Sequence, residues 1–468
     1  MGTGALLVRT GYGNTVGLIL LVACAALVLV AGYEFGVAPK IAQAAGIGIL
    51  CMGCWATGVI PEIVTTLLFF ALSMLLAIAP PAIVFSGFAS SAFWLVLSGM
   101  VVGLAITTTG LGIRIARSLA QPLSKSYTWL IGGVVAISYG LSFLMPSNMG
   151  RIALLIPIML ALADHVGLVA GRLGRTGVVL AVGFATFMLS TSVLPANVPN
   201  LVMAGAAETI YGLHFSYLPY LALHAPVLGI LKGVLLVVLI LLIFPDRLEY
   251  VEPPSVERVP EPWTSGERRL AVLLIITLAL WMTDSIHHIQ PAWVGLASAV
   301  ICFLPRVGVI EPDAFSKINF RTMFYVAGLL GLVATVDQTG LGRQLSLDLL
   351  NWAPFAPSSA ASNFATLVGL TSTLSLVATA NGEPALFTPM AREISLSTGF
   401  GLQTVIMTQV IGFSTVFFPY QAPPIIVAIE LGGVKLAAAT KLALATAAMS
   451  LLLLAPVNYL WWRFLGLL

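Results

Sequence analysis

The sequence predicts an all-α protein that crosses a membrane many times, and two observations lead to this fold class. Of its 468 residues, 59% are hydrophobic and 8% are charged, which is far from the composition of a soluble domain. Many apolar stretches, with 16–30, 218–244 and 442–459 among the clearest, approach or exceed the roughly 18 residues that span a bilayer. We therefore expect a polytopic protein of a bacterial inner (plasma) membrane, surrounded by membrane lipid.

The predicted elements follow in an order that places a charged linker near the middle of the chain. Residues 245–269 are rich in proline and in charged side chains, so this segment is expected to be solvated and cytoplasmic. We predict N-terminal transmembrane helices over 1–54, a first repeat over 55–244 with a re-entrant hairpin at about 127–162, the linker over 245–269, and a second repeat over 270–468 with a re-entrant hairpin at about 358–393.

Short motifs shared by the two halves indicate a duplicated unit. Thr-Gly-Leu-Gly at 109–112 returns at 339–342, which is 230 residues later, and Trp55 is matched by Trp281, each shortly before a proline. Basic residues gather in the short loops of the first half and are sparse in the corresponding loops of the second. Because such residues favour the cytoplasmic side, we expect the two repeats to be inverted relative to each other.

Each half also contains two polar breaks inside apolar sequence. The breaks are 146–151 and 197–200 in the first half, and 379–383 and 422–425 in the second. Hydrocarbon tolerates freed backbone groups only where they line a cavity within protein, and interrupted segments at corresponding places in two halves point to the binding site of a transporter. We interpret 146–151 and 379–383 as hairpin tips, and the two proline-containing breaks as unwound spans.

The hairpin tips suit an anion or a small cation. A helix N-terminus offers unpaired N–H groups and a positive dipole end, which favour an anion. Ser147, Asn148 and Asn381 add side-chain donors and acceptors. Together with carbonyl groups freed by the unwound spans, the same side chains can coordinate Na+. The alternative is that these polar side chains only cap helix ends and bind nothing.

From about residue 45 onward the sequence resembles the divalent-anion/sodium symporter family of the wider ion-transporter superfamily. That family carries Ser-Asn-Thr at each hairpin tip, a proline shortly afterwards, and unwound helices rich in Thr-Pro-Pro. The stretches that match this pattern are 147–149 before Pro157, 381–382 before Pro389, and the unwound segments 197–200 and 422–425.

The resemblance implies about eleven transmembrane helices and two re-entrant hairpins, in a homodimer whose transport part slides as an elevator. It implies dicarboxylates, tricarboxylates or sulfate as substrates, commonly driven by Na+, with exchange in some members. The candidate substrate-binding residues are Ser147, Asn148, Met149, Arg151, Asn200, Thr379, Asn381, Gly382, Pro423 and Pro424, with Pro199 also lining the pocket. The candidate Na+ ligands are Ser147, Asn148, Asn197, Asn381 and Ala422.

The tips depart from the family pattern in ways that bear on ion coupling. Met149 and Gly382 stand where the family has threonine, so two expected hydroxyls are absent. The tips instead carry Arg151 and Glu383, and charges at membrane depth are costly and functional by default. Arg151 is a candidate fixed positive charge that replaces a bound Na+, and Glu383 is a candidate proton acceptor. Alternatively, both charges project into water or pair with each other across the pocket.

The sequence therefore predicts a secondary active transporter of small anions. Na+ coupling is the first hypothesis, proton coupling or anion exchange the alternative, and a passive anion channel ranks after these. No Asp pair, Ser-Lys pair, metal-spaced histidine set or nucleophile motif stands in the broken regions, so an enzyme is not expected. A net charge of +3 gives no support to a nucleic-acid partner. No cofactor is expected apart from Na+ as a coupling ion.

Overall fold

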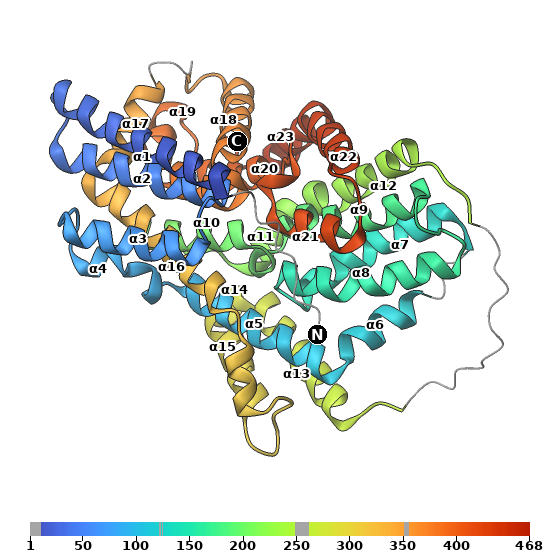
Figure 1. The fold of residues 1–468 in the computed structure, drawn as a ribbon. Coiled ribbons are helices and arrows are strands. Elements are labelled where there is room, and N and C mark those ends of the chain that lie inside the picture. Colours follow the sequence, from blue (N-terminus) through green and yellow to red (C-terminus); the bar gives the residue numbers. More distant parts are fainter. Residues whose placement is uncertain (1–10, 121–122, 124, 249–261, 351–354) are drawn as a thin grey trace.

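The computed structural model describes residues 11–120, 123, 125–248, 262–350 and 355–468, and within them all regular structure is helical (Figure 1). Seven of the described helical segments are long and apolar enough to cross a membrane. These findings confirm the predicted all-α membrane fold. Residues 249–261 of the predicted linker lie outside the described residues.

The helices of the first half are α1 (Gly11–Glu34), α2 (Pro39–Thr57), α3 (Glu62–Leu75), α4 (Pro81–Val84), α5 (Ser91–Thr109), α6 (Leu111–Ala120), α7 (Tyr127–Gly140), α8 (Asn148–His165), α9 (Leu173–Met188), α10 (Val198–Tyr211), α11 (Tyr217–His224) and α12 (Lys232–Ile243). A 3-10 turn at Leu189–Ser192 extends α9. A π-helical turn at Ala225–Leu231 joins α11 to α12.

The helices of the second half are α13 (Ser265–Met282), α14 (Asp284–His287), α15 (Pro291–Phe303), α16 (Phe320–Thr339), α17 (Leu341–Leu350), α18 (Ala360–Phe387), α19 (Ala391–Thr398), α20 (Leu402–Phe413), α21 (Pro423–Gly432), α22 (Leu436–Met449) and α23 (Ala455–Phe464). A π-helical turn at Ser450–Leu454 joins α22 to α23, as its counterpart joins α11 to α12.

The motifs shared by the two halves occupy the same kind of turn in each half. Gly110 ends α5 with φ 80° and Gly340 ends α16 with φ 82°. This left-handed conformation is natural to glycine and commonly terminates a helix. The indole of Trp55 donates to the carbonyl of Glu62 at 3.3 Å, and that of Trp281 donates to the carbonyl of Pro291 at 2.9 Å. The tryptophans therefore tie the end of α2 to the start of α3, and the end of α13 to the start of α15.

The polar breaks lie slightly earlier than the sequence suggests. The non-helical residues of the first tip are 144–147, so Asn148 and Arg151 belong to the first turn of α8. In the second tip only Thr379 leaves the helical conformation, and the segment after it is helical again. The unwound spans precede α10 and α21, with Pro199 and Pro423 in the first turns of those helices. Proline is accepted there because a first-turn N–H has no intrahelical partner.

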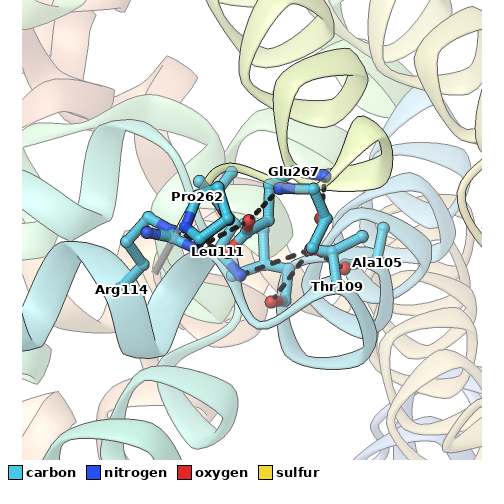
Figure 2. Close-up of polar contacts among 8 residues, drawn as sticks. Ala105, Thr109, Leu111, Arg114, Pro262 and Glu267 are labelled. Carbon is cyan, nitrogen blue, oxygen red and sulfur yellow. Dashed lines mark hydrogen bonds and ion pairs between the residues drawn. The ribbon is translucent and has the colours of Figure 1, made fainter. Parts of the chain in front are cut away.

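The short helix α6 is fastened to the beginning of the second half (Figure 2). The Arg114 guanidinium donates to both carboxylate oxygens of Glu267, at 2.7 Å from Nε and 3.0 Å from Nη2, and to the Pro262 carbonyl at 3.3 Å. The guanidinium also lies 5.3 Å from the centre of the Trp263 ring. Glu267 in turn completes a capping box with Thr264 at the start of α13. These contacts fix the position of α6 relative to α13.

The two halves interlock at the centre of the molecule, where α10 and α11 lie between the groups of helices on either side (Figure 1). Helix α21 packs on α8 and α9, and α10 packs on α18. Helix α18 also packs closely on α20, and a Cβ atom at Gly412 would lie 2.4 Å from Thr371 Oγ1. Small residues permit such close approach between membrane helices. This packing brings the helix that follows or contains each predicted hairpin tip against a helix that follows a predicted unwound span of the other half.

Candidate functional site

The first tip is organised around a buried arginine. The Arg151 side chain is 0% exposed. Its guanidinium donates to the carbonyl oxygens of Met145 at 2.8 Å, Thr186 at 3.2 Å and Ala196 at 3.1 Å, and to Asn148 Oδ1. The three carbonyls come from the tip, from α9 and from the unwound span before α10. The arginine therefore joins the hairpin tip to the broken crossing of the same half.

Two further candidate residues belong to the same network. Asn148 Nδ2 donates to Asn197 Oδ1 at 2.8 Å, and Asn197 Nδ2 donates to the Phe187 carbonyl at 3.0 Å. Asn148 Oδ1 also accepts from Ser190 Oγ at 3.3 Å. The structure thus brings together Asn148, Arg151 and Asn197, three candidates that lie in two separate breaks of the sequence.

Other first-half candidates have different surroundings. Ser147 Oγ caps α8 by accepting from the Gly150 N–H at 3.1 Å, which is the capping role that the sequence offered as an alternative. Met149 is 43% exposed. Asn200 is buried, and its amide nitrogen donates to the carbonyls of Thr191 and Val193 at 3.1 and 3.0 Å. Its Oδ1 atom has no hydrogen-bond partner among the described residues.

The second tip is strained and tightly packed. Thr379 has φ 66° and ψ 165°, a conformation otherwise almost confined to glycine, and such strain clusters at ligand sites. The Asn381 side chain interacts with the hydroxyl of Tyr325 on α16. A Cβ atom at Gly382 would lie 2.5 Å from Met52 Cε. A larger residue at this position would therefore require the end of the flexible Met52 side chain to move.

The two charged residues of the tips hold matching positions with opposite sign. Arg151 follows the cap residue Ser147 by four positions, and Glu383 follows Thr379 by four. Both side chains are 0% exposed, so the alternative that they project into water is wrong. No ion pair joins them within the described part of the chain. Neither carboxylate oxygen of Glu383 has a hydrogen-bond partner there.

A buried cation that sequence reasoning missed contacts the second unwound span. Lys232, the first residue of α12, is 0% exposed. Its ammonium donates to the main-chain carbonyl of Ser414 at 2.6 Å and to Ser414 Oγ at 3.1 Å. A single lysine inside a long apolar stretch is itself a functional signal, and this rule points to Lys232 from the sequence alone.

The remaining candidates line the start of α21. Pro424 and Ala422 are buried and Pro423 is half-buried. The Ala422 carbonyl accepts from the N–H of Ile425 at 2.9 Å, which leaves one lone pair for a further donor or an ion. Helices α8, α10 and α21, and the part of α18 after Thr379, all begin at the breaks. Their N-terminal N–H groups and dipoles favour an anion.

Comparisons with known proteins agree with this architecture. Residues 13–468 match the sequence profile of the sodium:sulfate symporter transmembrane region. A membrane protein of Cupriavidus necator is 25% identical over 350 residues, covering 72% of this chain and 68% of the relative. The sodium-dependent dicarboxylate transporter SdcS of Staphylococcus aureus is 20% identical over 323 residues, covering 63% of this chain and 62% of SdcS. The chain therefore spans less than two thirds of SdcS.

The YdaH transporter of Alcanivorax borkumensis is a solved structure with a similar fold. It matches with a TM-score of 0.51 and 16% sequence identity, covering 81% of this chain and 86% of that one. At this identity the likeness concerns the fold alone. The family profile and the seven apolar segments identify a multi-pass integral membrane protein, as predicted, and both sequence relatives are bacterial.

Proposed function

The chain belongs to the sodium:sulfate symporter family, and from this we propose that it is a secondary active transporter of small anions of the dicarboxylate or sulfate class. The observation that carries the proposal is the meeting of hairpin tips and broken crossings deep in an apolar protein. Four helices begin there, and polar side chains converge on the first tip. Helix N-termini at such breaks are suited to anionic substrates.

We propose that transport proceeds by alternating access of the elevator type, with two inverted repeats. The matching Gly110 and Gly340 turns, the paired indole contacts and the paired π-helical turns support a duplicated unit. On this scheme the crossings are α1, α2, α3, α5, α9–α10, α11–α12, α13, α15, α16, α20–α21 and α22–α23. When the first repeat is extended to begin at α2, ahead of residue 55, each repeat has five crossings plus a hairpin, and this odd number accounts for the inverted orientation. The same family resemblance supports a homodimer.

Na+ is the first candidate for the coupling ion, because the relative SdcS is named as sodium-dependent. Its ligands would come from the side chains of Ser147, Asn148 and Asn197 in the first half, and from Asn381 and the Ala422 carbonyl in the second. Hydroxyl, amide and carbonyl oxygens at half-helix ends are the groups that hold Na+ in transporters with broken helices.

Exchange or proton coupling is the second candidate, and the position of Arg151 favours it. The guanidinium already donates to the Asn148 side-chain oxygen and to three carbonyls, which a Na+ ion would otherwise use. Glu383, buried and without a partner among the described residues, would accept the proton in a proton-coupled cycle. A buried carboxyl without a partner is strongly favoured in its neutral form.

Thermal unfolding against a panel of anions, with Na+ or with choline, tests the proposal. A bound anion at a hundred times its dissociation constant should stabilise the protein by about 2.7 kcal/mol. Stabilisation by succinate, citrate or sulfate only with Na+ present supports sodium coupling. Equal stabilisation without Na+ supports exchange or proton coupling. The absence of any anion effect, or ion flux at channel rates, contradicts the proposal.

A further inference from the structure

Lys232 is a buried cation whose hydrogen bonds to the described residues both go to Ser414. An ammonium carries three N–H donors, and its two hydrogen bonds go to the carbonyl and the hydroxyl of Ser414. No carboxylate forms an ion pair with it within the described residues. Burying a charge without a counter-ion is costly, so a lysine at this depth has a specific role.

Ser414 lies where a broken crossing exposes its main-chain oxygens. It is the C-cap residue of α20, and the chain stays largely non-helical from there until α21 begins at Pro423. The last carbonyls of a helix lack intrahelical donors and carry the negative end of the dipole. In transporters with interrupted helices these ends coordinate Na+. Lys232 Nζ thus contacts the type of oxygen ligand that a Na+ ion uses.

The first half has a related arrangement at the corresponding place. The pair Ser190-Thr191 follows α9 as the pair Ser414-Thr415 follows α20. Ser190 Oγ donates to Asn148 Oδ1, and the Arg151 guanidinium donates to the same oxygen. Each broken crossing therefore has a buried protein cation beside the serine at its first bend.

We propose that the Lys232 ammonium is a resident cation of the second broken crossing and occupies a Na+-type site at Ser414. This inference rests on the proposed transport function, because a coupling-ion site has meaning only in a transporter. It names a residue of α12, from the first half, as the group that fills an ion site of the second half. Transport through this crossing then requires no Na+ at Ser414.

Thermal unfolding of Lys232→Ala in a titration with NaCl, against choline chloride at equal ionic strength, tests the assignment. The substitution removes the ammonium and leaves the Ser414 oxygens and a space for an ion. We expect the unfolding midpoint of the variant to rise with Na+ and to saturate, while the wild type lacks this added response. Lys441→Ala is the matched control, since Lys441 is an exposed lysine of the apolar helix α22. This control should respond to Na+ as the wild type does.

A Lys232→Ala protein whose Na+ response equals that of the wild type overturns the proposal. If the variant is recovered folded from NaCl but not from choline chloride, Na+ has replaced the ammonium and the proposal stands. A variant that is unfolded in both salts contradicts it, because Na+ then fails to substitute for Lys232. These readouts involve no substrate anion, because both salts supply the same concentration of chloride. A failure here is therefore distinct from a failure of the transport function, which would appear as a wild type without anion response.

Discussion

Replacing Arg151 by glutamine tests the role of the buried guanidinium at the first tip. Glutamine is neutral and shorter, so it cannot reach the acceptors that surround the arginine. The carbonyls of Met145 and Ala196, which lie outside the α-helices, lose the donor that the arginine supplies. A buried acceptor that loses its donor costs about 1–3 kcal/mol, or about 2–6 kcal/mol for two. Removing the buried charge also removes its desolvation cost, which offsets part of this loss of stability.

We therefore expect Arg151→Gln to be less stable than the wild type by about 2 kcal/mol, and to lose its stabilisation by anions. The assay is thermal unfolding with and without succinate or sulfate, compared within each variant, so that the loss of intrinsic stability cancels. Arg151→Lys is the matched control, because it keeps the positive charge and should keep part of the anion response. A full anion-induced shift in Arg151→Gln would refute a role of the guanidinium in substrate binding.

Three further predictions concern the second tip and the helix α6. Thr379→Gly should relieve the strained backbone and raise the free energy of unfolding by about 1 kcal/mol. If thermal unfolding shows a less stable variant, the backbone at Thr379 is not strained. Glu383→Gln should leave stability unchanged but remove the pH dependence of anion uptake, and an unaltered pH profile would exclude Glu383 as the proton acceptor. Glu267 lies before the apolar part of α13, and its hydrogen bond with Arg114 lowers its pKa to about 2. Its contribution, about 1 kcal/mol, is therefore complete above the ordinary carboxyl pKa of about 4.3 and is lost as the pH falls towards 2. Arg114→Ala should abolish this loss in unfolding measured between pH 6 and pH 3.

The sequence predicts interruptions close to both places where the helices are interrupted, at 144–147 and at Thr379, because polar residues stand out against a membrane-spanning background. Its boundaries for the breaks were late by a few residues. The prolines predict unwound chain, whereas Pro199 and Pro423 occupy first turns of helices, where their missing N–H is tolerated.

The contacts within the site depend on tertiary packing that no local pattern encodes. Arg151 reaches carbonyls of Thr186 and Ala196, which are 35 and 45 residues away along the chain. Lys232 and Ser414 are 182 residues apart. The apolar stretch around Lys232 hides this lysine, because one charge hardly changes the mean hydropathy of a long segment. A charged residue inside a membrane span is therefore better recognised by its own side chain than by the mean hydropathy of the surrounding segment.

Uptake of labelled succinate and of labelled sulfate into proteoliposomes tests the central claim most directly. The vesicles hold the purified protein, and the gradient is imposed as Na+, as H+ or as unlabelled anion inside. The account predicts saturable accumulation of at least one anion against its gradient, driven by one of these three conditions and absent from protein-free vesicles. Uptake that only equilibrates the anion and never exceeds the external concentration, under all three conditions, would contradict a secondary active transporter.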